Sequence, residues 1–276
     1  MNFPPELIEQ IIVAAQEDTR CLRACGLTCG LFYSISSKYL FRHVYVCALP
    51  INNAEKLHAV LETSPHLRLL IHSITVECSR CWIYPAAFSN IFSSKFPGLE
   101  RLNIVGASWK IFPKDAKDAI LSALRTNDLQ CLNLTSMQDF PFSKLRECQS
   151  LRELALVKSS YDEEDLLNED LLSVSKRVLA IETPMQLKSL RLAPYPVAPQ
   201  VITMLRKSLN WFKSSTCPFS ISRLQNLSLR TSDLTEGIPL FNELFRFVDP
   251  LSLKWLNLDV RHDGKLKLYD FISKLT

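Results

Sequence analysis

The cysteines and histidines are the residues of this chain whose types could support metal or redox chemistry. Cys78-Ser-Arg-Cys81 is its single CxxC motif, and His66 and His72 lie a few residues upstream. A structural zinc ion takes four such ligands in a tetrahedron, yet neither a second CxxC nor a matched Cys/His pair follows. A thioredoxin-like redox pair would need a βαβ context around the motif. The pattern therefore favours neither a metal site nor a redox site.

Three further cysteines, Cys21, Cys25 and Cys29, are spaced by four residues along a predicted helical region. This spacing is typical of one packed helical face, where cysteine acts as a small apolar residue. The sequence has no HExxH, no GxSxG and no glycine-rich phosphate loop. An acidic run, which is typical of a solvated loop or face, comprises Asp162, Glu163, Glu164, Asp165, Glu169 and Asp170. We therefore expect no enzymatic activity and no cofactor.

The dominant pattern of the chain is a recurring LxxLxL motif. Six strict copies begin at Leu99, Leu129, Leu151, Leu187, Leu224 and Leu253, and two looser copies begin at Phe41 and Ile71. Successive copies are separated by 30, 28, 30, 22, 36, 37 and 29 residues. Such recurrence, with helix-forming segments between the copies, is typical of leucine-rich repeats. The sequence thus predicts an α/β leucine-rich-repeat solenoid over residues 45–276, with about eight irregular repeats.

Side-chain alternation along a strand assigns the two faces of the predicted parallel sheet. The fourth and sixth residues of each copy point to a core, and the third, fifth and seventh point away from it. One repeat cannot bury enough apolar surface alone, so neighbouring copies must stack. The outward residues would line the concave face, where we expect a target protein to contact Arg101, Asn103, Asn133, Glu153, Arg191, Arg230, Trp255, Asn257 and Asp259. A merely solvated sheet face is the open alternative.

Short helices are predicted in the intervals between the strands. Their apolar residues recur at helical spacing, and proline, Asn-Asp or Asp-Pro pairs mark the turns around them. The predicted helical ranges are 53–63, 85–92, 115–124, 197–212 and 238–248, with one turn at 143–147 and a further helix starting near 270.

The first forty residues predict three short helices with apolar stripes. The first spans residues 4–16, Asp18 is placed to cap a second that breaks at Gly26, and a third runs from about Leu27 to Leu40. These helices cannot bury their stripes against one another alone, so they need the first repeat strand or a partner protein as a neighbour. Another interpretation is that they only cap the end of the solenoid.

The N-terminal residues also carry a family resemblance. The relevant stretches are Phe3-Pro-Pro-Glu-Leu-Ile-Glu-Gln-Ile-Ile12, Leu22-Arg-Ala-Cys-Gly-Leu-Thr-Cys29, Phe32 and Tyr39-Leu-Phe-Arg-His-Val44. Together they resemble an F-box, particularly those that open many fungal F-box proteins with leucine-rich repeats. Phe3 and Phe32 stand where the usual pattern has leucine and tryptophan, and Thr28 replaces an apolar residue. The replacements at Phe3 and Phe32 preserve apolar bulk.

The resemblance implies a function for both parts of the chain. A three-helix F-box domain, residues 1–44, would dock on a Skp-family adaptor and through it on a cullin. Its contacts would come from Phe3, Pro4, Pro5, Leu7, Ile8, Ile11, Leu22, Cys25, Leu27 and Phe32. The repeats would hold a protein target for a Skp–cullin–F-box ubiquitin ligase, acting by proximity. The alternative is a non-catalytic repeat scaffold for protein interactions.

Composition and charge restrict the remaining function classes. The 276 residues are 47% hydrophobic, and no apolar run approaches the roughly 18 residues that a membrane-spanning helix needs. The N-terminus lacks the features of a signal peptide, so we expect a soluble protein of the cytosol or nucleus, with its nine cysteines as free thiols or small apolar residues. A net charge of +4 is too small to imply nucleic acid. Nucleic-acid binding through Arg101, Arg191 and Arg230 is accordingly a weak hypothesis.

Overall fold

The computed structural model describes residues 4–47, 52–78, 91, 95–106, 108–125, 128–159, 184–193, 200–213, 217–231 and 241–260. Three helices come first, α1 (Pro5–Ala14), α2 (Thr19–Gly26) and α3 (Gly30–Leu40). The strands of the main sheet are β1 (His43–Cys47), β2 (Ser73–Glu77), β3 (Arg101–Val105), β4 (Cys131–Thr135), β5 (Glu153–Val157), β7 (Ser189–Ala193), β9 (Asn226–Thr231) and β10 (Trp255–Val260). The fold is therefore α/β.

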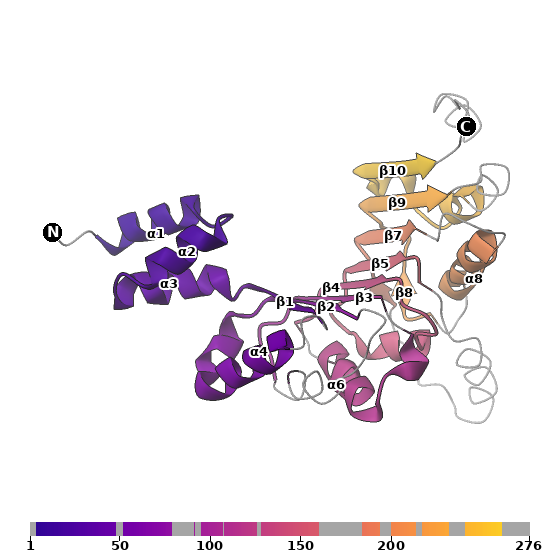
Figure 1. The fold of residues 1–276 in the computed structure, drawn as a ribbon. Coiled ribbons are helices and arrows are strands. Elements are labelled where there is room, and N and C mark those ends of the chain that lie inside the picture. Colours follow the sequence, from indigo (N-terminus) through magenta and orange to yellow (C-terminus); the bar gives the residue numbers. More distant parts are fainter. Residues whose placement is uncertain are drawn as a thin grey trace.

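The main sheet has eight parallel strands in the order β1-β2-β3-β4-β5-β7-β9-β10, which is the order of the sequence (Figure 1). Each strand coincides with one copy of the leucine motif, and the register aligns the copies residue by residue. For example, Leu102 pairs with Leu132, and Leu132 with Leu154. The predicted parallel sheet is thus confirmed.

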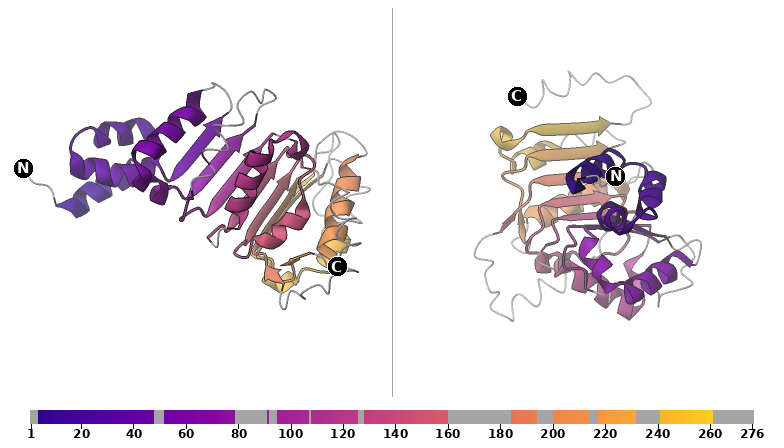
Figure 2. Two further views of the ribbon diagram at one scale, coloured as in Figure 1. Left: turned by 90° about the horizontal axis from the view of Figure 1, so that it is seen from below. Right: turned by 90° about the vertical axis from the view of Figure 1, so that its left-hand side faces the viewer.

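Helices cover one face of this sheet, and no helix among the described residues lies on the other, which is called the open face here (Figures 1 and 2). The connecting elements are α4 (Asn52–Thr63), η1 (Pro65–Leu70), η2 (Trp109–Ile111), α6 (Lys114–Leu124), η3 (Phe142–Glu147), α8 (Gln200–Lys213) and η4 (Pro250–Ser252). The predicted helices at 53–63, 115–124 and 197–212 are confirmed, with bounds shifted by a few residues. The short interval of 22 residues holds only the 3-10 helix η3, since it lacks room for a longer one.

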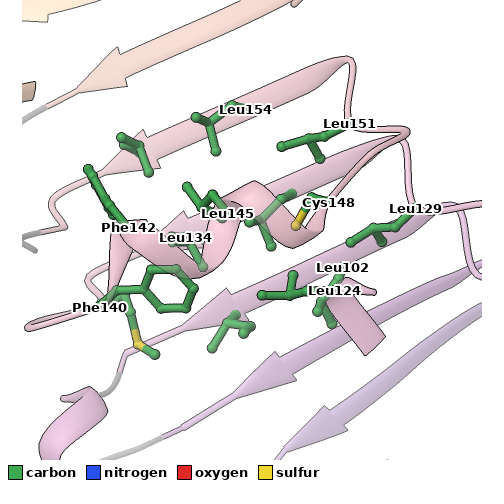
Figure 3. Close-up of a cluster of buried hydrophobic side chains, with 14 of the residues drawn as sticks. Leu102, Leu124, Leu129, Leu134, Phe140, Phe142, Leu145, Cys148, Leu151 and Leu154 are labelled. Carbon is green, nitrogen blue, oxygen red and sulfur yellow. The ribbon is translucent and has the colours of Figure 1, made fainter. Parts of the chain in front are cut away.

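The core lies between the sheet and its outer helices. Leucines of adjacent strands meet there with side chains from η3, and Leu102, Leu134 and Phe140 are completely buried (Figure 3). Aromatic rings continue this layer toward α8, where the centroids of Phe142 and Trp211 lie 4.9 Å apart. Burying these apolar surfaces between the sheet and the helices is the main stabilising contribution, because a single strand and helix could not do it alone.

Backbone hydrogen bonds continue the pairing beyond both ends of the strands. At the amino-terminal edge, the carbonyl of Arg152 accepts from the amides of both Lys188 (2.7 Å) and Ser189 (3.1 Å), and the same double acceptance recurs between all neighbouring strands. Past the carboxyl end of β3, the amide of Gly106 donates to Thr135 O at 2.7 Å. Gly106 has φ +78°, and a Cβ there would lie 2.9 Å from the carbonyl oxygen of Cys78, so glycine is required.

The three N-terminal helices have a small hydrophobic cluster of their own. Its buried residues are Ile8, Ile12, Leu22 and Ile35, whereas the main cluster begins at Phe41. Asp18 caps α2 as predicted, because its Oδ1 accepts from the amides of Arg20 (2.8 Å) and Cys21 (3.1 Å). In Figure 1 these helices lie beyond β1, at one end of the sheet.

The third helix begins later than predicted. Leu27 and Thr28 form a turn in which the Thr28 hydroxyl donates to Cys25 O at 2.8 Å, so α3 starts only at Gly30. The predicted start at Leu27 is therefore wrong, and Leu27 does not belong to the stripe of α3. The predicted helices at 85–92 and near 270, and the start of the one at 238, lie wholly or largely outside the described residues.

Candidate protein-interaction surfaces

The N-terminal helices carry the first candidate surface, which consists of exposed apolar side chains. Leu7 and Ile11 lie one turn apart on α1 and are 46% and 52% exposed, and Leu27 is 89% exposed in the turn before α3. Residues four apart on a helix share one face, so Leu7 and Ile11 form a continuous apolar strip. Large apolar side chains that gather in water in this way are typical of interaction sites.

The structure separates the predicted adaptor contacts into three groups. Pro4, Pro5, Leu7, Ile11 and Leu27 are exposed, while Cys25 and Phe32 are half-buried. Ile8 and Leu22 are only 4% and 1% exposed, because they form the interior of the helical cluster. In this arrangement their side chains hold the helices together and offer a partner no surface. Phe3 lies outside the described residues.

Helix α3 carries two further exposed apolar residues, which the sequence reasoning did not select as adaptor contacts. Leu31 and Tyr33 are 40% and 46% exposed. The sequence pattern placed Leu31 on one apolar stripe with Leu27 and Ile35, and only Ile35 of the three is buried. The shorter α3 is one reason, since it removes Leu27 from that helix.

The open face of the main sheet is the second candidate surface, and its polar side chains bond to one another. Thr75, Asn103 and Asn133 occupy the central position of three adjacent strands. Nδ2 of Asn133 donates to Oδ1 of Asn103 at 2.7 Å, and Nδ2 of Asn103 donates to Oγ1 of Thr75 at 2.8 Å. Two of the predicted target-binding residues are therefore held in a hydrogen-bonded row.

Two ion pairs involve four more of the predicted target-binding residues. Arg101 on β3 reaches Glu153 on β5 at 3.6 Å, past Cys131 on the strand between them. Burial raises the pKa of the Cys131 thiol to about 12, so this thiol is neutral at ordinary pH. Nearer the end of the sheet, Nε of Arg230 lies 3.0 Å from Oδ2 of Asp259. Most of the charged residues that the sequence analysis predicted to contact a target are therefore paired with one another.

Three of the predicted target-binding residues remain available on this face. Arg191, Trp255 and Asn257 are exposed and form no ion pair or side-chain hydrogen bond with a described residue. Tyr45 on β1, which sequence reasoning did not select, is also exposed and pairs in register with Thr75. The repeat pattern could have found it, because it lies at the fifth position of the first looser copy, Phe41–Val46.

The cysteines and one histidine have side-chain pKa values that their surroundings shift. Burial raises the pKa of Cys78 above its ordinary value, and Cys81, the other half of the CxxC motif, lies outside the described residues. Cys29 is exposed at the N-terminus of α3, where the amide of Phe32 lowers its pKa. Partial desolvation lowers the pKa of His43, with Arg42 and Arg101 adding to the effect.

The described residues hold neither a metal site nor a membrane-spanning helix, and the chain has no match among known families or curated proteins. Within the described ranges, no group of three or more His, Cys, Asp and Glu side chains is arranged to hold a metal ion. In the same part of the chain, no helix combines the length and apolar character needed to cross a membrane. No model of a known protein family matches the chain, and no curated protein matches it significantly.

Proposed function

We propose that this chain is the substrate-recognition subunit of a Skp–cullin–F-box ubiquitin ligase. Its N-terminal helices would bind the Skp-family adaptor, and its sheet face would hold the protein target. The observation that carries the proposal is the exposed apolar strip of Leu7 and Ile11 on α1, in a region whose residues resemble an F-box. The chain itself performs no chemistry in this proposal and acts by bringing the target near the ligase.

The size of the helical cluster supports a docking role for these helices. Four buried apolar side chains form its interior, so its own apolar burial is small for a unit of three helices. A partner that covers Leu7, Ile11 and Leu27 would add to that burial and stabilise the cluster. The same residues would then contribute both to stability of the cluster and to affinity for the adaptor.

The composition of the open sheet face supports target recognition by the second part. Trp255 is 52% exposed at the end of the sheet, and Arg191 is exposed two strands away. Tryptophan and arginine are the residue types that most often dominate the energy of protein interfaces. The helices on the opposite face leave the strands open to a partner (Figure 2).

Co-purification with a Skp-family adaptor tests the proposal. The wild type should retain the adaptor, and a Leu7→Asp/Ile11→Asp variant should retain it at least about tenfold less, because charges would replace the apolar strip. An Ile111→Asp/Leu251→Asp variant is the matched control, since both residues are exposed and lie far from α1 in sequence. It should bind as the wild type does. Absence of binding by the wild type, or equal binding by the α1 variant, would reject the proposal.

A further inference from the structure

Unpaired positive charge collects at one part of the amino-terminal edge of the main sheet. Arg152, Lys188 and Lys254, called the basic edge here, immediately precede strands β5, β7 and β10. All three side chains are exposed, and none forms an ion pair with a described residue. Gln225 occupies the equivalent position before β9. No acidic side chain interrupts this series.

Backbone hydrogen bonds set the spacing of the basic edge. The amide of Lys188 donates to Arg152 O at 2.7 Å, the amide of Gln225 donates to Lys188 O at 2.8 Å, and the amide of Lys254 donates to Gln225 O at 2.8 Å. Neighbouring strands lie about 4.8 Å apart, so the three basic residues span about 14 Å. An extended peptide rises about 3.4 Å per residue and covers that distance in about four residues.

The acidic side chains of the same strands are paired with other residues. Glu153 and Asp259 are the acidic residues within strands β5, β7, β9 and β10, and they pair with Arg101 and Arg230 respectively. Arg191, which lies inside β7, is likewise free of an acidic partner among the described residues. Positive charge on the same strands therefore continues from the edge onto the open face.

The opposite end of the same edge is different. There His72 lies 3.2 Å from Glu100, and Gln130 follows before β4. Arg42 precedes β1 at this end, so basic and acidic residues are mixed here, and the series of basic residues without an acidic one is restricted to the later strands.

From this arrangement we infer that the basic edge binds an extended acidic segment of a protein partner. Carboxylates on alternate residues of such a segment would face Arg152, Lys188 and Lys254, and a neighbouring apolar side chain would contact Trp255 on the open face. This inference names the chemical class of target for the recognition surface and rests on the proposed function. The partner is defined here only by its acidic, extended character.

A nucleic acid is the other polyanion that could bind, and the residues favour it less. Sequence-independent binding to a nucleic acid typically neutralises about six to ten phosphates, whereas the basic edge and Arg191 together supply four cations. Single-strand binders also stack successive bases on several aromatic rings. Trp255 is the single exposed aromatic side chain within strands β5, β7, β9 and β10.

Fluorescence anisotropy with a synthetic peptide tests the inference on the full-length chain. The probe is a labelled peptide of about ten residues that alternates Glu and Ser, at about 50 mM NaCl, and the comparison peptide replaces Glu by Lys. We expect the wild type to bind the acidic peptide alone. The Arg152→Gln/Lys188→Gln/Lys254→Gln variant should bind it about tenfold more weakly, and higher salt should reduce binding by the wild type.

A second triple variant, which also loses three positive charges, controls for the effect of net charge on peptide binding. Arg42, Lys56 and Lys114 are exposed basic residues elsewhere, and Arg42 precedes β1 at the opposite end of the same edge. The Arg42→Gln/Lys56→Gln/Lys114→Gln variant should bind the peptide within about twofold of the wild type. An equal loss in both variants, or no binding by the wild type, would overturn the inference.

A short single-stranded RNA provides the remaining arm of the test. Binding of the RNA through the basic edge without binding of the acidic peptide would overturn the inference in favour of a nucleic-acid ligand. The assay contains no adaptor, so its result does not depend on the N-terminal helices. If the chain retains the adaptor but does not bind the acidic peptide, only the inference of an acidic target is rejected. If it binds the peptide but does not retain the adaptor, only the adaptor proposal is rejected.

Discussion

Asn133 donates a 2.7 Å hydrogen bond to Asn103 on the neighbouring strand, and Asn103 donates in turn to Thr75 at 2.8 Å. This row runs across β2, β3 and β4 on the open face of the sheet. Each asparagine amide thereby donates a hydrogen bond to the side chain on the next strand. The polar side chains of β2, β3 and β4 therefore contribute to the stability of the sheet. Arg191 and Trp255, on later strands, have no such partner among the described residues.

Replacing the central residue of the row should destabilise the sheet. Asn103→Ala removes two hydrogen bonds and leaves the polar groups of Thr75 and Asn133 partly buried without their partner, so the free energy of unfolding should fall by about 1–2 kcal/mol. Asn257→Ala, at the equivalent position of β10, removes an exposed amide and should change it by less than about 0.5 kcal/mol. Urea unfolding followed by circular dichroism measures both. Equal values for the two variants would mean that the row contributes nothing to stability.

Gly106 provides a test of the turns that follow the strands. Gly106→Ala should reduce the free energy of unfolding by about 1–3 kcal/mol, because the residue has φ +78° and a new Cβ would meet the carbonyl oxygen of Cys78 at 2.9 Å. Ser136 follows β4 in the same way with φ 54°. Ser136→Gly relieves a left-handed backbone and should leave stability unchanged or raise it by up to about 1 kcal/mol. If both substitutions destabilise equally, backbone conformation is not the cause.

The parts of the structure that the sequence predicted depend on local patterns. Leu102 and Ile104 are buried together because residues two apart on a strand share a face. Asp18 caps α2 because its carboxylate reaches the amides two and three residues ahead. The pairing of Arg101 with Glu153 was not predictable in this way. Predicting this ion pair would require the conformations of two side chains on either side of an intervening strand. In the structure, these two expected binding residues instead pair with one another.

Very short elements also escaped prediction. The two-residue strands β6 (Met185–Gln186) and β8 (Phe219–Ser220) pair in a separate ladder, and neither is long enough to show alternation. The start of α3 was missed because Leu27 and Thr28 continue the end of α2 as a turn. The amides of Leu27 and Thr28 donate to Ala24 O and Cys25 O, and the Thr28 hydroxyl also donates to Cys25 O. Leu27 is exposed in this turn, so local hydrogen bonding that the helical pattern does not show affects the apolar surface proposed for docking.

Thiol reactivity should distinguish Cys29 from the buried cysteines. Amide donation from Phe32 lowers the pKa of the exposed Cys29, so alkylation by iodoacetamide should begin there, at a lower pH than for an ordinary thiol. Cys217 is buried, and its pKa is raised to about 12; it should react only after unfolding. Mass spectrometry of peptides after timed alkylation measures both rates. Faster labelling of Cys217 than of Cys29 in the folded chain would contradict the described environments.

Alkaline pH should destabilise the chain through the same buried thiols. The pKa of Cys217 is about 12 in the folded state against an ordinary value of 9.0, and Cys148 behaves alike. The unfolded chain therefore loses these protons first as pH rises above 9, so the stability from burial is complete below that pH and declines toward 12. Cys217→Ser/Cys148→Ser should weaken the decline in urea-unfolding experiments between pH 8 and 10 (about one unit either side of the ordinary pKa). An unchanged slope would assign the alkaline loss to other groups.

Removal of residues 1–40 separates the adaptor proposal from the interpretation of these helices as a cap. The helical cluster has its own interior of Ile8, Ile12, Leu22 and Ile35, and the main core begins at Phe41. Deletion should therefore leave cooperative unfolding of the sheet in place, with the midpoint lowered only slightly. It should also abolish retention of a Skp-family adaptor while binding of the acidic peptide persists. If the truncated chain instead loses its cooperative transition, and the intact chain binds no adaptor, the helices serve as a cap and the ligase assignment fails.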